Sequence, residues 1–195
     1  FWRDSRWWFA SDPLDSYYYQ IVNPDGSMDM QTDGAILLEN VPGIYSTIYP
    51  LHLNNGTTLF FFLCSVNGIT MIKAQAIDSQ GNVLWGENGL VIMNIQSNVD
   101  VSNLVVSAEG NAAYLAWSML SPDSSTRTYI QKVVDGIPQW GPTGMMLSSA
   151  DPAASVSEIP LSIEGRFVSL KVTTSEPYQR KLWLTHIEPD GSLTP

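Results

Sequence analysis

Hydrophobic residues recur along the chain in short runs that turn-forming residues separate. Between residues 49 and 93 four such runs predict strands, at 49–53 (YPLHL), 57–66 (TTLFFFLCSV), 70–77 (TMIKAQAI) and 82–93 (NVLWGENGLVIM). Alternating or apolar runs rich in β-branched and aromatic residues favour strands. The turns NNG, NG and DSQGN each supply a residue that tolerates positive φ. No window has a sustained helical period with caps, so the pattern predicts antiparallel β-sheet.

The same pattern repeats every 55 residues. Turn glycines stand at 55-residue intervals, at Gly26, Gly81, Gly136 and Gly191. Trp85 and Trp140 are also 55 residues apart. Two further glycine series, which start at Gly34 and at Gly56, keep the interval to within one residue. Agreement at this many positions predicts that the chain is built from about three and a half copies of one structural unit.

Four antiparallel strands in a repeat of roughly 40–50 residues are typical of one blade of a β-propeller. We therefore predict an all-β fold, with residues 1–195 forming a single β-propeller segment of four-stranded antiparallel blades. The units run approximately over 1–48 (partial), 49–103, 104–158 and 159–195 (partial). A closed ring has typically 4–8 blades. The chain is either most of a four-bladed ring or part of a larger one, and we favour the larger ring because isolated ends expose strand edges.

The repeat resembles one found in large secreted and cell-surface β-propeller proteins, especially those of Bacteroidetes-type bacteria, many of them exported by type IX secretion. The copy that carries the resemblance comprises Gln75, Ile77, Asp78, Gly81, Asn82, Leu84, Trp85, Gly86, Asn88 and Gly89. Trp2, Asp4 and Arg6 match another part of the motif. Met30 stands where the first unit should have Trp, and the third unit lacks the Asn after its turn glycine. These departures cast doubt on a shared site, and not on the architecture.

The resemblance implies an extracellular or cell-surface location, associated with the outer membrane, and a non-catalytic role. Our leading hypothesis is therefore that the chain is not an enzyme but an adhesion scaffold that binds a protein or a glycan. One alternative is an accessory propeller of a secreted protease or glycosidase whose catalytic domain lies outside this chain. Another is a structural subunit of an outer-membrane secretion or uptake assembly. The expected partners are a protein or glycan and the rest of a larger propeller or surface assembly.

Composition and charge limit the partners and the cellular setting that the chain can have. Nineteen Asp and Glu against nine Lys and Arg give a formal charge of −10, which repels nucleic acids and anionic membranes. The longest apolar run, LFFFLC, is far shorter than the roughly 20 residues of a membrane helix, so we expect no membrane insertion. Cys64 is the single cysteine and lies in an apolar run, so it is expected to be a buried hydrophobe. No cofactor or metal is implied.

The sequence contains no recognisable catalytic or ligand-binding motif. Residues 77–92 lack the GxGxxG pattern, the ligand count of a calcium loop and the spacing of a sialidase Asp box. The two histidines, His52 and His186, stand in strand-like surroundings far from any nucleophile elbow. Four carboxylates could converge in space, but nothing selects a pair for glycoside hydrolysis; they are Asp4, Asp12, Asp15 and Asp29. We assign no catalytic, cofactor or metal residue.

Aromatic residues near the start of the chain are the most suggestive feature for binding. Side chains that could form a recognition patch are Trp2, Trp7, Trp8, Tyr17 and Tyr19. Exposed Trp and Tyr rings are favoured at recognition sites. Neighbouring residues of a strand point to opposite faces, however, so some of these rings must face the core. We favour packing between blades and keep the exposed patch as the alternative.

Overall fold

A computed structural model describes the chain over residues 2–4, 14–31, 33–44, 47–95, 101–120, 126–146, 155–163, 166–175, 179–187 and 192–194. Every regular element in these ranges is a strand, and every strand pairing is antiparallel. The prediction of an all-β protein with antiparallel sheets is therefore confirmed. No helix in the described part of the chain is long and apolar enough to cross a membrane.

The strands form four sheets, each taken from one continuous part of the chain. The first sheet comprises β1 (Trp2–Asp4), β2 (Leu14–Tyr19) and β3 (Ala35–Pro42). The second comprises β4 (Tyr49–His52), β5 (Thr58–Val66), β6 (Ile69–Ile77) and β7 (Leu90–Ile95). The third comprises β8 (Val101–Glu109), β9 (Ala112–Leu120), β10 (Thr126–Val134), β11 (Ile137–Pro138) and β12 (Met145–Met146). The fourth comprises β13 (Ser155–Ile163), β14 (Arg166–Ser175), β15 (Gln179–Ile187) and β16 (Leu193–Thr194).

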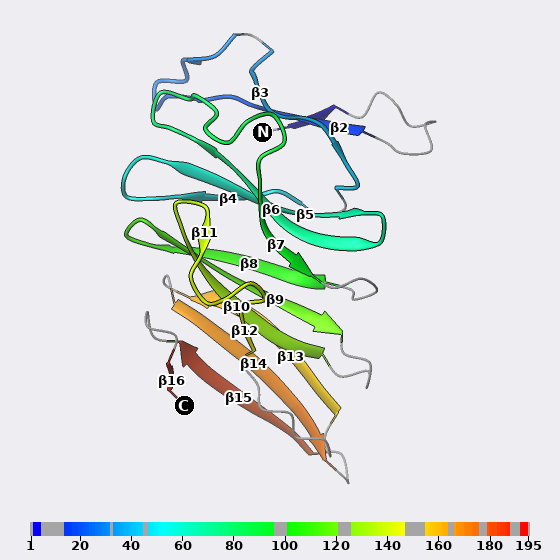
Figure 1. Ribbon diagram of the computed structural model, residues 1–195. Helices are drawn as coiled ribbons and strands as arrows, with labels where there is room; N and C mark the ends of the chain where they lie inside the picture. The colour runs from blue at the N-terminus through cyan, green and yellow to red at the C-terminus, as the bar shows by residue number, and fades with distance from the viewer. Residues whose placement is uncertain are drawn as a thin grey trace.

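Within each sheet the strands neighbour one another in chain order, and the sheets stack in the same order (Figure 1). Strand β3 contacts β5, β4 contacts β8, β7 contacts β11, and β13 contacts the third sheet. The first and fourth sheets lie at opposite ends of the stack in Figure 1. The described strands thus form part of a propeller-like stack and no closed ring.

Strand β5 explains why its sequence is apolar without interruption. Phe61 and Leu63 belong to the core between the second and third sheets, whereas Phe60 and Phe62 belong to the core between the first and second sheets. Successive side chains of a strand point to opposite faces, and both faces of this strand are covered. Each fully buried aromatic or aliphatic side chain contributes about 2 kcal/mol to folding. The two cores therefore hold three consecutive sheets together.

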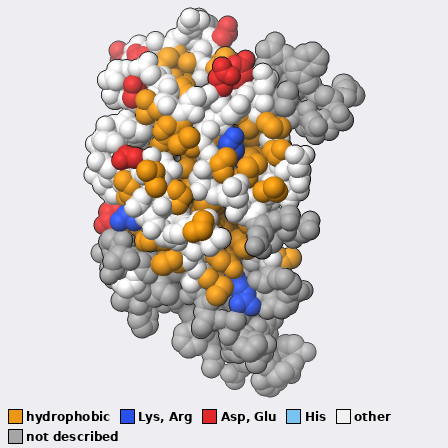
Figure 2. All heavy atoms as spheres, viewed as in Figure 1, with side chains coloured by type: hydrophobic (Ala, Val, Ile, Leu, Met, Phe, Trp, Pro, Cys, Tyr) orange, Lys and Arg blue, Asp and Glu red, His pale blue; other side chains and the backbone are white. Residues whose placement is uncertain are grey.

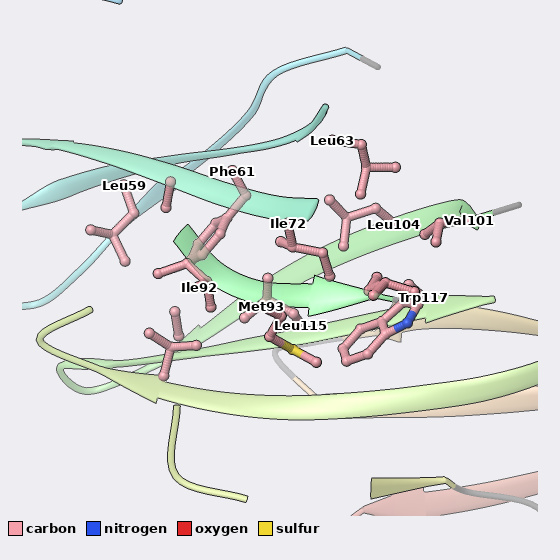
Figure 3. Close-up of a cluster of buried hydrophobic side chains, with 14 of the residues drawn as sticks. Leu59, Phe61, Leu63, Ile72, Ile92, Met93, Val101, Leu104, Leu115 and Trp117 are labelled. Carbon is pink, nitrogen blue, oxygen red and sulfur yellow. The ribbon is translucent and has the colours of Figure 1, made fainter. Parts of the chain in front are cut away.

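The core between the second and third sheets is the larger of the two. Its members include Ile72 and Ile92 from the second sheet and Leu115 and Trp117 from the third, which point toward one another in Figure 3. Cys64 is 1% exposed and lies in the other core, as expected for a small hydrophobe. Burial raises the pKa of the Cys64 thiol, which keeps it protonated.

The fourth strand of the second sheet differs from its prediction. Residues 82–93 were expected to form one strand, but regular pairing begins only at Leu90. The preceding residues make a single bridge between Ile77 and Val83 and then turn through Gly86 and Gly89, both at positive φ. A residue at positive φ cannot continue an extended strand. The Trp85 segment is therefore an irregular loop that leads into β7.

Candidate functional site

In each of the first three units a glutamine, on a strand or just after it, holds the irregular segment that follows. Gln75 is fully buried; its Oε1 accepts the Trp85 N–H at 3.2 Å and its Nε2 donates to the Gly86 carbonyl. In the next unit the buried Gln131 accepts the Trp140 N–H at 2.8 Å and donates to the Gly141 carbonyl at 2.7 Å.

The first unit has the same contacts. Gln20 accepts the Met30 N–H at 2.9 Å and donates to the Gln31 carbonyl at 3.0 Å. The three glutamines thus satisfy backbone groups that no neighbouring strand could reach. They place Met30, Trp85 and Trp140 at equivalent positions of the three units, and Met30 and Trp85 lie beside the turn glycine of the next sheet.

The turn glycines of the repeat lie at positive φ, +84° at Gly26, +83° at Gly81 and +77° at Gly136, while Gly191 is outside the described residues. Two of them also contact the preceding sheet. A Cβ on Gly136 would lie 2.8 Å from Leu90 Cδ1 and 3.3 Å from Trp85 Cζ2. A Cβ on Gly81 would overlap Met30 and lie 3.1 Å from Ile21 Cδ1. These glycines are therefore points of close packing between sheets as well as turns.

Asp78 and Asn82 close the turn that contains Gly81. Asp78 Oδ1 accepts the backbone N–H groups of Gln80 at 2.9 Å and Asn82 at 2.8 Å, and Oδ2 accepts the Asn82 side-chain amide. The hydrogen bonds from Asn82 hold the pKa of Asp78 below its usual range. Within the described residues no group of three or more potential metal-ligating side chains occurs. Asp78 is thus occupied by the turn itself.

A cavity of about 110 Å³ lies between the second and third sheets, at the end where these turns project. Its apolar lining comes from both sheets and includes Leu53, Leu59, Trp85 and Val133. Its polar lining comes from three tight turns and consists of Asn55, Thr57, Asn111 and Asp135. Asn55, Asn111 and Asp135 are exposed, so the polar groups stand where solvent or a ligand can reach them.

The polar turns of the cavity are fixed by backbone contacts. Asn55 Oδ1 accepts the Thr57 N–H at 3.0 Å, which closes the turn between β4 and β5. The neighbouring Asn54 N–H donates to the Gly110 carbonyl at 3.0 Å and joins this turn to the β8–β9 turn of the next sheet. Asp135 sits at φ +50° immediately before Gly136. The lining residues are therefore held on tight turns, which favours a preformed site.

The corresponding interface between the first and second sheets is filled differently. There Tyr19 donates its hydroxyl to the Gly81 carbonyl, and Ile21 and Met30 pack beside the same glycine. One repeat later, Tyr19 and Ile21 correspond to Ala74 and Ala76, both fully buried. Two large side chains that reach across the first interface are thus replaced by methyl groups at the second. At the second interface Leu90, the strand partner of Ala74, packs beside the turn glycine Gly136 instead.

The cavity combines groups that suit a polyhydroxylated ligand. An indole ring offers an apolar surface, and amide, hydroxyl and carboxylate groups offer hydrogen bonds in both directions. Glycoside hydrolysis uses a pair of carboxylates about 5–10 Å apart. Among the described lining residues Asp135 is the one carboxylate, so the cavity has the chemistry of binding and lacks that pair.

The alternative of an exposed aromatic patch does not hold for the two candidate rings that the structure describes, Tyr17 and Tyr19, and the favoured prediction of packing between sheets does. Tyr17 and Tyr19 are 4% and 3% exposed and belong to the core between the first and second sheets. Strand β2 is covered on this face by the second sheet, so neither ring is free to bind a ligand. The side chain of Trp2, and Trp7 and Trp8 entirely, lie outside the described residues.

Of the repeat tryptophans, Trp85 lines the cavity and Trp140 packs against Tyr114, with ring centroids 5.8 Å apart. Asn55, Asn111 and Asp135 were not predicted from the sequence as site residues. Their types are those of ordinary turn residues, and the sequence carries no signal that brings three separate turns together.

Comparison with known proteins gives structural neighbours alone, since no family model and no curated protein matches the chain. An endo-arabinase from Bacteroides thetaiotaomicron has a TM-score of 0.49 and 12% sequence identity, over 92% of this chain and 68% of the other. A thermostable family-43 glycoside hydrolase has a TM-score of 0.44 and 13% identity, over 95% of this chain and 71% of the other.

Both neighbours are glycoside hydrolases, and this finding corrects two expectations. The chain was expected to be a non-catalytic adhesion scaffold and not an enzyme. Both neighbours are enzymes by name, and the non-catalytic assignment is withdrawn. At this level of similarity no residue role transfers to the chain.

Proposed function

We propose that the chain is a segment of a larger β-propeller in a secreted hydrolase that acts on carbohydrate, and that it holds part of the glycan. The observation that carries this proposal is the cavity between the second and third sheets. Its lining of Trp85, Asn111 and Asp135 suits the apolar face and the hydroxyl groups of a sugar ring. The reacting carboxylates are assigned to parts of the protein beyond the described residues.

A neutral sugar fits the electrostatics better than a charged one. The Asp135 carboxylate at the rim and the formal charge of −10 repel sulfated, phosphorylated or uronic sugars. A hydroxyl group donates well to a carboxylate, whereas a second carboxylate in the same place is repelled. We therefore place neutral polysaccharides first among the substrates.

The location and the ring size belong to the same proposal. Secretion or surface attachment agrees with an acidic chain that has a single, buried cysteine. A ring with more blades than this chain supplies would cover the outer faces of the first and fourth sheets. Fractionation of the producing cells, and the mass of the full-length protein, test these two points.

The experiment is an assay of reducing-sugar release by the full-length protein on arabinan and a set of other neutral polysaccharides. Trp85→Ala should raise KM on the polymer about three- to tenfold with little change in kcat, because a stacking contact outside the reacting bond contributes about 0.5–1.5 kcal/mol. Asn111→Ala should act in the same direction. Asn94→Ala, at an exposed position on β7, is the matched control and should leave KM unchanged.

Two results would overturn the proposal. One is a full-length protein that releases sugar from none of the polysaccharides. The other is active protein whose KM is the same in the Trp85→Ala, Asn111→Ala and Asn94→Ala variants. Thermal melting of each variant separates loss of binding from loss of folding.

A further inference from the structure

The lining of the cavity changes from apolar to polar between its floor and its rim. The floor consists of Leu53, Leu59 and Val133, which are at most 4% exposed. The rim includes Asn111 and Asp135, which are exposed turn residues. The cavity is therefore closed below by buried aliphatic side chains and opens to solvent among polar ones.

Two contacts between the second and third sheets close the cavity at its sides. On the side of β4 and β8, the Asn54 N–H donates to the Gly110 carbonyl at 3.0 Å. On the side of β7 and β11, the Trp85 ring packs against the turn of Gly136, where a Cβ would lie 3.3 Å from Trp85 Cζ2. Strands β4 and β7 are the two edges of the second sheet, and β8 and β11 are the two edges of the third. The cavity is thus a blind pocket between the two contacts, and not a groove that runs across the sheets.

The volume of the blind pocket limits what can enter it. The pocket measures about 110 Å³, whereas an apolar cavity of about 150 Å³ holds a single benzene molecule. A sugar unit has more non-hydrogen atoms than benzene. The pocket therefore receives part of one sugar unit, and the rest of that unit stays at the rim.

A unit in the middle of a glycan chain does not fit this shape. It has a neighbour on each side, and these neighbours would have to pass through the Asn54–Gly110 and Trp85–Gly136 contacts. We propose that the blind pocket holds the terminal, non-reducing unit of a neutral glycan, at the end of a main chain or of a branch. This inference rests on the proposed function and specifies which part of the glycan the site holds.

The chemistry of the pocket suits the insertion of a terminal unit. The C–H groups of the inserted ring would face Trp85 and the aliphatic floor. Its hydroxyl groups would stay at the rim beside Asn111 and Asp135, because a hydroxyl buried against aliphatic side chains without a hydrogen bond is costly. Hydrophobic and uncharged polar groups cover most of the described surface in Figure 2, which agrees with a neutral ligand.

The test compares three forms of arabinan, or of whichever neutral polysaccharide the full-length protein hydrolyses. The first is a long unbranched chain, which has few ends for its mass. The second is an unbranched oligosaccharide reduced with borohydride, so that its non-reducing end is its one cyclic terminus. The third is the polysaccharide with branches of a single sugar unit. For each form, KM is measured for the parent protein and for each variant.

The variant Trp85→Ala should raise KM about three- to tenfold on the oligosaccharide and on the branched polysaccharide. On the long unbranched chain the rise should stay below about twofold, because most of its units cannot enter the pocket. A rise on the branched form alone would assign the pocket to branches, and a rise on the oligosaccharide alone would assign it to main-chain ends. Either result supports a site for terminal units.

A second variant blocks the pocket without removing a buried side chain. Asn111→Tyr places a ring at the exposed rim and should raise KM on the same two substrates about tenfold, because it covers the one opening. Asn94→Tyr makes the same change at an exposed position on β7 and should leave every KM unchanged. Thermal melting shows whether each variant is folded.

The outcomes separate this inference from the proposed function. An equal rise in KM on all three substrates would overturn the terminal-unit site and leave the proposed glycan site standing, since the pocket would then contact units along the chain. Unchanged KM on all three substrates in folded, active Trp85→Ala and Asn111→Tyr proteins would overturn both. A full-length protein that hydrolyses no neutral polysaccharide would also overturn both.

Discussion

The glycine at position 136 meets two demands of different origin. Its φ of +77° is costly for any residue with a Cβ, and a Cβ there would also press against Leu90 and Trp85 of the preceding sheet. Gly26 has nearly the same backbone, with φ at +84°, but nothing lies within 4 Å of its Cβ position. Comparison of the two positions therefore distinguishes the cost of backbone strain, which both share, from the cost of packing between sheets, which only Gly136 has.

We predict that Gly26→Ala lowers the free energy of unfolding by about 1 kcal/mol, the cost of positive φ alone. Gly136→Ala should lower it by about 2–4 kcal/mol, because overpacking adds to the same strain. Urea denaturation of both variants measures the difference. Equal losses would mean that Leu90 and Trp85 move aside freely and that the contact does not hold the sheets together.

At the scale of the element, a buried side chain decides where the last strand of the second sheet begins. The hydrophobic pattern places a strand at 82–93, yet Gln75 turns the backbone at Trp85 and Gly86 and delays the strand to Leu90. The repeat shows Gln20, Gln75 and Gln131 at matching positions. It does not show that their amides bind the main chain nine to eleven residues later, because that contact exists only once the sheet has formed.

Replacement of Gln131 by Ala should lower the free energy of unfolding by about 2–4 kcal/mol. The change leaves the Trp140 N–H and the Gly141 carbonyl without a partner in a partly buried place. Gln80→Ala is the control, since Gln80 is exposed in a turn, and its effect should stay within about 0.5 kcal/mol. Chemical denaturation measures both. Matching stabilities for the two variants would show that water replaces the amide.

At the scale of the whole molecule, consecutive sheets are held by packing and by a small number of hydrogen bonds. Tyr19 supplies one of these, from β2 of the first sheet to the Gly81 carbonyl of the second. Burial raises the pKa of Tyr19, and the nearby Asp78 carboxylate raises it further. An ionised Tyr19 would lose its proton donor and face that carboxylate.

The sign of the pH dependence follows from the raised pKa. The stability that Tyr19 contributes is fully present below its unfolded pKa of about 10 and is lost as pH rises through the higher folded value. Tyr19→Phe should cost about 1 kcal/mol at neutral pH, the usual value of one hydrogen bond. Above pH 10 the stabilities of the variant and the parent should converge. Thermal melting across this range is the measurement, and a constant difference would contradict the role of the hydroxyl.

Local chemistry allowed much of the fold to be predicted from the sequence. The turns NNG, NG and DSQGN need residues that tolerate positive φ, and the structure places Gly56, Gly68 and Gly81 there at +85°, +76° and +83°. The run LFFFLC indicates a strand covered on both faces, and β5 is such a strand. These features depend on each residue and its near neighbours.

The candidate site could not be predicted in this way. Asn55, Asn111 and Asp135 come from three turns that are far apart in the chain, and each looks like an ordinary turn residue. Packing between blades was the favoured prediction for Tyr17 and Tyr19, and the alternative of an exposed patch does not hold for them because a second sheet covers their strand. Whether a ring is exposed depends on which sheet packs over it, and spacing along the chain does not carry that information.

The sequence by itself determined the unit, because its period, its turns and its alternating hydrophobic faces are local properties that one chain segment expresses alone. The tertiary structure decided what lies between the units. Tyr19, Ile21 and Met30 pack beside the turn glycine Gly81 at one interface, whereas Leu90 and Trp85 pack beside Gly136 at the next, where alanines stand at positions 74 and 76. A cavity is a difference between the volume that two packed sheets enclose and the volume that their side chains fill, so it exists only after the sheets have met.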